Sequence, residues 1–416
     1  MVMSTKKICF ACNEDGFGPS AFAYYVVRAI IETWRATHDK DRLEIWILNA
    51  SAYAFNQALY AGFPEVHLAR VDSLIRLEKV HGEVSVKRTL ERLSPYAQSR
   101  TAYSQALQAY LEGCHRAVDI GVPLFARSAK QAGVPTLTFF DHSWAATVRG
   151  ICSEEVRYYY NPSPTLEDRV VAQQLAAEIE SDEACTREVF LFDRYITPPE
   201  FRRHWEGLGL TPQILPGVLG QREEPGAARE RLNALFIQLD EQPVPADQPL
   251  VLLSPGGTPV WDRLLVKIID TYIMRETGNY LPVLSRPNVS DEDKDRMRRS
   301  AHIRWFDFPA GSTQQVLLPA FDLVVTRAGG GTVNDCLASQ TPFVCVEEPQ
   351  WQVQLIEREC KTLHLIPDLA ETSWPIFQQD PASCIDTFVT TPKPVPNISV
   401  PGGAEKYLAN VIVSSP

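Results

Sequence analysis

The residues best suited to chemistry lie in the segment DLVVTRAGGGTVND. Its apolar run predicts a buried strand, and the consecutive Gly329, Gly330 and Gly331 let the backbone approach a ligand without an intervening Cβ. A helix expected to begin near Thr332 would direct free N–H groups and the positive end of its dipole at the same point. Because Arg327 adds a fork of donors that suits phosphate oxygens, the pattern predicts an anion site.

A carboxylate follows this turn. Asp335 comes one helical turn after the glycines, where it could bind the hydroxyl groups of a ribose. A simpler interpretation stays open, because three glycines after a strand can also make only a tight turn into a helix. For an isolated glycine triplet this simpler interpretation is the more common one, so the surrounding residues decide.

These surroundings resemble the donor motif of GT-B glycosyltransferases, in particular the peptidoglycan N-acetylglucosaminyltransferases and the UDP-glycosyltransferase superfamily. The matching residues, in order, are Arg327, Gly329, Gly330, Gly331, Thr332, Val333, Asp335, Pro342, Pro349 and Gln354. The resemblance implies that Arg327 and the glycines bind a diphosphate and that Gln354 selects the sugar. The sequence departs from the motif where Asp335 replaces the usual Glu, where Gln340-Thr341 replaces Gly, and where Val353 replaces an acidic residue.

A second glycine turn, SPGGTP, follows the first strand of the C-terminal half. Its Gly256, Gly257 and Thr258 resemble the turn that places amides and a hydroxyl beside the diphosphate and sugar in the same family. Both glycine turns should open onto one crevice at the carboxyl ends of parallel strands. In HIRWFDF, Phe306 stands where the family's nucleotide base lies, although Trp305 and Phe306 could equally be core aromatics.

The N-terminal loop NEDGFGPS resembles the acceptor loop of that superfamily, and its Gly16 and Gly18 are included in the predicted site. The family's histidine is replaced here by Pro19. Inverting transfer needs a base for the acceptor proton, so another residue would have to serve.

Four side chains could supply that base: Glu14, Asp15, Asp141 and His142. We favour Asp15, in the loop after the first strand, and place His142 second. Asn-Glu-Asp before Gly is also an ordinary solvated turn, and a lone histidine beside aromatic residues is more often structural.

Strands alternate with helices along both halves, which predicts an α/β protein of two Rossmann-like, doubly wound domains facing across a cleft. A stretch rich in proline, glycine and charge places the boundary near residue 220. We expect an acceptor domain over 1–219 and a nucleotide-sugar domain over 220–416. The last helix, within the final 25 residues, could pack back on the N-terminal domain.

The composition of the chain limits the kinds of partner that we expect it to bind. The net charge of −11 argues against sequence-independent binding to nucleic acid, which needs a cationic face. No apolar run is long enough for a secretory or membrane-spanning segment, and nine scattered cysteines suit reduced thiols, so we expect a cytoplasmic protein. Cys9 and Cys12 are interpreted as core thiols of a strand. The spacing of histidines and carboxylates predicts no metal site, and oligomeric state is left open.

The resemblance leads to one functional expectation and two rivals. The expectation is a glycosyltransferase that moves a sugar from a nucleotide-diphosphate sugar, UDP-linked by family habit, to a hydroxyl of a small-molecule or lipid acceptor, with inversion and without a metal or other cofactor. One rival is a nucleotide-sugar epimerase of the same fold. The other is a protein that binds the nucleotide-sugar with little or no turnover.

Overall fold

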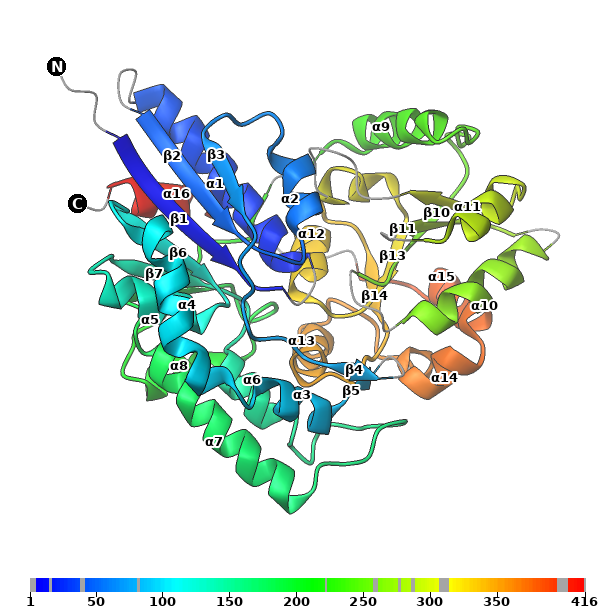
Figure 1. Cartoon of the computed structure of the whole chain (residues 1–416). Helices are drawn as coiled ribbons and strands as arrows, with labels where there is room; N and C mark the ends of the chain where they lie inside the picture. Colours follow the sequence, from blue (N-terminus) through cyan, green and yellow to red (C-terminus); the bar gives the residue numbers. More distant parts are fainter. Residues whose placement is uncertain are drawn as a thin grey trace.

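The structure is a computed structural model. It describes residues 5–14, 17–37, 42–80, 83–220, 223–256, 261–275, 278–285, 289–306, 314–394 and 403–414. These residues form two lobes, each built on a parallel β-sheet (Figure 1).

The first lobe is built on a seven-stranded parallel sheet of order β3-β2-β1-β6-β7-β8-β9. Its strands are β1 (Thr5–Cys12), β2 (Arg42–Leu48), β3 (Val66–Ala69), β6 (Arg116–Ile120), β7 (Thr136–Phe139), β8 (Glu188–Leu191) and β9 (Gln213–Ile214). The apolar run predicted for the first strand is confirmed, because β1 is buried from Ile8 to Cys12 between layers of helices. The sheet order reverses beside β1, which pairs with both β2 and β6.

Helices cover this sheet, and a short hairpin projects from the lobe. The helices are α1 (Gly18–Thr37), α2 (Tyr53–Tyr60), α3 (Val86–Leu93), α4 (Tyr96–Leu111), α5 (Pro123–Gln131), α6 (Trp144–Gly150), α7 (Leu166–Glu183) and α8 (Pro199–Gly207). The hairpin consists of β4 (Lys79–Val80) and β5 (Glu83–Val84). It lies next to α13 and the second lobe, away from the large sheet of the first (Figure 1).

The second lobe repeats this plan with a five-stranded parallel sheet of order β12-β11-β10-β13-β14. Its strands are β10 (Leu250–Ser254), β11 (Leu281–Ser285), β12 (Arg304–Phe306), β13 (Leu323–Thr326) and β14 (Phe343–Cys345). Its helices are α9 (Pro225–Gln238), α10 (Asp262–Ile273), α11 (Asp291–Arg298), α12 (Gly330–Ser339), α13 (Trp351–Thr362), α14 (Trp374–Gln379) and α15 (Pro381–Thr390), with short 3-10 turns η2 (Gln314–Val316), η3 (Leu318–Ala320) and η4 (Ala370–Thr372). Two doubly wound sheets therefore stand in one chain, as the strand and helix pattern predicted.

The chain passes between the lobes and returns. The last helix, α16 (Ala404–Ser414), packs against α1 in the first lobe (Figure 1). The linker that leaves the first lobe is tied to it, because the Gly220 N–H donates to Glu405 Oε2 at 2.9 Å. The same linker is bound to the second lobe, where the Asn334 side chain bonds both the N–H and the carbonyl of Leu219 at 2.9 and 3.0 Å.

The lobes also interlock directly. The Trp351 ring of α13 fills the space beside Gly150 of α6, where a Cβ would come within 2.0 Å of the indole. Glycine at 150 is therefore required by a contact between the lobes.

Helix α4 stops at Leu111, because Gly113 takes a left-handed conformation with φ 66° and the next strand, β6, begins at Arg116. The helix expected to begin near Thr332 is present and begins at Gly330.

In the part of the chain that the structure describes, no helix combines the length and the apolar character needed to cross a bilayer. Cys9 and Cys12 are core thiols as predicted, and burial raises the pKa of both.

Candidate functional site

A cavity of about 120 Å³ lies between the lobes, at the carboxyl ends of the parallel strands. The first lobe contributes the segments that follow β1 and β7, and the second contributes those that follow β10, β13 and β14. The first sheet reverses its strand order at β1 and the second at β10, so the cavity lies where open α/β sheets bind their ligands.

The N-terminus of α12 forms one wall of this cavity. Gly329 is the N-cap residue, and the first amide to donate back is that of Val333, to the Gly329 carbonyl at 3.0 Å. The amides of Gly330, Gly331 and Thr332 therefore precede the hydrogen-bonded ladder, at the positive end of the helix, and all three residues line the cavity. Anions bind readily in this geometry.

The other lobe approaches this glycine turn closely. A Cβ at Gly331 would come within 3.4 Å of the Gly18 Cα, and one at Gly330 within 2.2 Å of the Asp141 Oδ2. The predicted N-terminal loop and the predicted glycine turn thus meet across the cleft. Gly256, with φ 74°, also lines the cavity.

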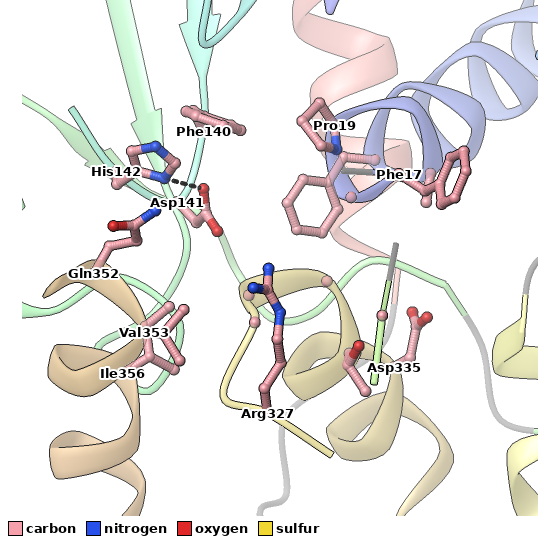
Figure 2. Close-up of a pocket in the computed structure, with 18 of the residues that line it drawn as sticks. Phe17, Pro19, Phe140, Asp141, His142, Arg327, Asp335, Gln352, Val353 and Ile356 are labelled. Carbon is pink, nitrogen blue, oxygen red and sulfur yellow. Dashed lines mark hydrogen bonds and ion pairs between the residues drawn. The ribbon is translucent and has the colours of Figure 1, made fainter. Parts of the chain in front are cut away.

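Arg327 extends into the cavity from the end of β13 (Figure 2). Its Nη1 lies 2.7 Å from both carboxylate oxygens of Glu348, a residue that is 1% exposed. Its Nε lies about 3.5 Å from the position that a Gly256 Cβ would occupy, on the side of the glycine turns. The guanidinium therefore has a built-in anionic partner that the sequence motif did not reveal.

Asp141 and His142 face this guanidinium from the end of β7 (Figure 2). Asp141 Oδ1 and His142 Nδ1 are hydrogen-bonded at 2.8 Å, so an ionised Asp141 accepts from the Nδ1–H. The other oxygen, Oδ2, lies against Gly330 at the start of α12. The His142 ring packs against Phe140 and Trp144, and its Nε2 is buried with no hydrogen-bond partner among the described residues.

The structure distinguishes among the four candidate bases. Glu14 is structural: Oε1 accepts from the amides of Ala50 and Ser51, Oε2 from that of Ser73, and Glu14 does not line the cavity. Burial raises the pKa of this carboxyl. Asp15 and Gly16 lie outside the described residues, so the first choice for the base stays a prediction.

Asp335 lines the cavity and is linked to both lobes. Its Oδ1 accepts from the Tyr25 hydroxyl of α1 at 3.0 Å, from Asn334 Nδ2 at 3.3 Å and from Gln315 Nε2 at 3.4 Å. Desolvation raises the pKa of Asp335 to about 7, while the bonds from Tyr25 and Asn334 act in the opposite direction. A carboxylate so held could still present Oδ2 to a hydroxyl group.

The structure places two predicted site residues elsewhere. Phe306 is 0% exposed and packs in the core, so no nucleotide base can lie against it in this conformation. Gln354 does not line the cavity, because it is rotated by roughly 100° along α13 from Val353, which does. Gln350 and Gln352 line the cavity instead. Gly257 and Thr258 fall outside the described residues.

The sequence motifs also missed an apolar half of the cavity. Its members are Phe17, Phe22, Phe55, Phe140, Val353 and Ile356. The aromatic residues come from the first lobe, and two of them pack together, with the ring centroids of Phe17 and Phe55 4.8 Å apart. The phenylalanine between the two glycines of NEDGFG was the available signal. The cavity thus joins a polar wall, whose helix N-terminus suits an anion, to an apolar wall.

Among the described residues, no group of three or more histidine, cysteine or carboxylate side chains is placed to hold a metal ion.

Comparison with known proteins identifies the fold. No family model matches the sequence, and no curated protein sequence matches it significantly. Among solved structures, a glycosyltransferase of kitacinnamycin is similar with a TM-score of 0.55 and 12% identity, over 98% of each chain. UGT73P12 of Glycyrrhiza uralensis, complexed with glycyrrhetinic acid 3-O-monoglucuronide, aligns with 99% of this chain and 91% of its own at TM-score 0.53 and 13% identity. SsfS6 of Streptomyces sp. SF2575, complexed with thymidine diphosphate, aligns with 99% of this chain and 100% of its own at TM-score 0.52 and 12% identity. The chain therefore has the GT-B fold.

Proposed function

We propose that this chain is a glycosyltransferase that moves a sugar from a nucleotide-diphosphate sugar, UDP-linked, to a hydroxyl acceptor with inversion. The observation that carries the proposal is the cavity itself. A helix N-terminus and Arg327 lie on one side, and the Asp141 carboxylate lies on the other. This arrangement suits a reaction in which a diphosphate departs on one face and a hydroxyl loses its proton on the opposite face.

The second lobe would hold the donor. The amides of Gly330, Gly331 and Thr332 would bind the diphosphate oxygens, and Arg327 would add charge-assisted hydrogen bonds. As the bond between C1 of the sugar and the phosphate oxygen breaks, negative charge grows on the departing diphosphate. Fixed donors aimed at this charge lower the barrier without a metal, so we expect none to be needed. Asp335 would bind the ribose hydroxyls.

We propose Asp141 as the base that accepts the acceptor proton. Its Oδ2 faces the start of α12, while His142 fixes Oδ1 through Nδ1. The acceptor oxygen would form its bond to C1 as its proton passes to Oδ2, and the nucleoside diphosphate would leave. His142 then acts as a positioning residue for Asp141, and Asp15 stays the alternative base.

The acceptor would carry its hydroxyl on an apolar framework. Phe17, Phe22 and Phe55 line the first-lobe side of the cavity, where a ring system would bury more favourably than a strongly hydrated sugar chain. The glycyrrhetinic acid derivative in one similar structure is a ligand of this kind.

The cleft would open and close in each cycle. A cavity of about 120 Å³ is smaller than the 300–1,000 Å³ that small-molecule sites commonly have. We therefore infer that the lobes separate to admit the donor and close again to exclude water, which competes with the acceptor.

A specific observation keeps one rival in view. Pro19 and Val353 stand where the family has a histidine and an acidic residue, and both line the cavity. A protein that binds nucleotide-sugars with little turnover would tolerate both changes. An epimerase would need further acid and base groups around one sugar carbon. Among the described residues that line the cavity, Asp141 and His142 form one hydrogen-bonded pair, and Asp335 is the other carboxylate.

Incubation with UDP-sugars and phenolic or terpenoid alcohols tests the proposal. We expect glycosides of inverted configuration, together with slow hydrolysis of the donor. Asp141→Asn should lower turnover about 10²- to 10⁴-fold while binding UDP normally, since a general base contributes on that scale. Asp291→Asn, at a carboxylate whose side chain is 99% exposed, is the matched control. Wild-type turnover by Asp141→Asn would refute the assignment, isomerised donor would favour the epimerase, and UDP binding without chemistry would favour the binder.

A further inference from the structure

Glu348, just after β14, is a buried carboxylate shared by cations of both lobes. It is 1% exposed and lies 2.7 Å from Arg327 Nη1. Lys79 Nζ approaches the same carboxylate at 4.0 Å, and the Lys79 side chain is only 6% exposed. An ammonium group so buried needs an anionic neighbour to offset its lost hydration, and Glu348 is in position to be that neighbour.

Lys79 is held in place by its own lobe. It belongs to the β4–β5 hairpin, which lies apart from the two large sheets and reaches toward the second lobe (Figure 1). In this hairpin the Glu83 carboxylate accepts hydrogen bonds from the amides of Tyr159, Tyr160 and Asn161, at 2.7–3.0 Å. The Asn161 side chain in turn donates to the Val80 carbonyl at 3.1 Å. Hydrogen bonds to residues 159–161 therefore hold the hairpin in place.

The segment bound to the hairpin makes a second contact with the end of β14. The Tyr159 hydroxyl donates to Glu347 Oε1 at 3.2 Å, next to the contact between Lys79 and Glu348. Two successive glutamates of the second lobe are therefore bound by two side chains of the first.

The charges of this cluster decide what Arg327 can do. Glu348 alone would neutralise the guanidinium and compete with any phosphate for its donors. With Lys79 present, a second cation lies beside the same carboxylate, which weakens the hold of Glu348 on the guanidinium. At close range in a buried setting, such a change in neighbouring charge alters electrostatic interactions strongly.

We infer that Lys79 is a positioning residue of the diphosphate site: it binds Glu348 and so leaves Arg327 able to bind the donor. This inference rests on the proposed function, because it needs a diphosphate at Arg327. Lys79 and Glu348 come from different lobes, so both lobes contribute a charged side chain to the surroundings of Arg327.

Calorimetric titration of the full chain with UDP tests this role. Lys79→Met should weaken UDP binding about tenfold, within the range typical of coupled sites. Lys79→Arg, which keeps the charge, should restore affinity to within about twofold of the wild type. In a Glu348→Gln background, Lys79→Met should change UDP affinity little, because no carboxylate remains to be shared. Lys87→Met, at an exposed lysine of α3, is the matched control.

The outcomes separate the two proposals. Wild-type chain that binds no UDP overturns the proposed function and this inference together. Wild-type chain that binds UDP, with folded Lys79→Met binding equally well, overturns this inference alone. An equal loss on Lys79→Met with and without Glu348→Gln also overturns it, because Lys79 would then act by general charge or by stabilising the fold.

Discussion

Replacing Arg327 by methionine tests the anion site most directly, because its cost can be worked out from two contacts. The guanidinium Nη1 lies 2.7 Å from each oxygen of Glu348, which is 1% exposed. Breaking a buried ion pair by removing one partner costs about 3–5 kcal/mol. Lys79 still approaches Glu348, so we expect a cost near 3 kcal/mol, or a fall in melting temperature of roughly 6–12 °C.

The second half of this prediction separates stability from binding. Adding Glu348→Gln to Arg327→Met removes the buried charge, so most of the lost stability should return. UDP affinity should not return: losing hydrogen bonds from a charged donor costs about 1.5–3 kcal/mol, or roughly 10- to 150-fold in affinity. Thermal denaturation and calorimetric titration measure the two effects.

Two results would refute this reasoning. An unchanged melting temperature for Arg327→Met would show that the pair with Glu348 contributes nothing. A double variant that binds UDP as tightly as the wild type would show that Arg327 is not a phosphate ligand. Arg28→Met, at a guanidinium 56% exposed in a surface pair, is the control and should change stability by less than about 1 kcal/mol.

Two further predictions concern the cleft. Gly330→Ala should lower turnover by about tenfold or more while leaving the stability of the fold nearly normal. The added Cβ would lie 2.2 Å from Asp141 Oδ2 and keep the lobes from closing. Unchanged turnover would contradict this contact. Burial raises the pKa of Asp335 from 3.8 to about 7, so the folded chain binds the proton of this carboxyl more tightly than the unfolded chain does. The contribution of this proton to the stability of the fold is therefore full below pH 4 and is lost as the pH rises through 7. Melting temperatures of the wild type relative to Asp335→Asn should therefore fall between about pH 4 and pH 7, and a constant difference would show that Asp335 is not perturbed.

The sequence revealed the parts of the site that depend on local physics. A glycine run after an apolar strand favours a turn into a helix, so the helix N-terminus that lines the cavity could be predicted from Gly329 to Gly331. The helix begins at Gly330, because Gly329 takes an extended N-cap conformation with φ −78° and ψ 133°. Glycine tolerates both helical and extended backbone, so its type alone does not locate the cap.

The rest depended on which distant segments meet. Glu348 follows β14 in sequence, and nothing nearby indicates that Lys79 of a hairpin in the other lobe approaches its carboxylate. Phe306 was misplaced for a related reason: an aromatic at a strand end is exposed or buried according to the helices packed on that end, and here it is fully buried. Gln354 was assigned to the site only by its position in the family motif. The orientation of α13 directs Gln352 and Val353 to the cavity instead.

The linker and the last helix determine how the lobes can move. Leu219 is bound to Asn334 beside the anion-binding turn, Gly220 is bound to Glu405 of α16, and the Ala404 amide donates to the Val218 carbonyl at 3.4 Å. The two segments that connect the lobes are therefore hydrogen-bonded to each other at this crossing, and we expect the lobes to rotate about an axis that passes through it, close to α12. Motion about such an axis displaces the rim of the cleft far more than its floor. The N-terminus of α12, where we propose that the diphosphate binds, would thus move little during opening. Ligands would enter from the rim of the cleft opposite the crossing.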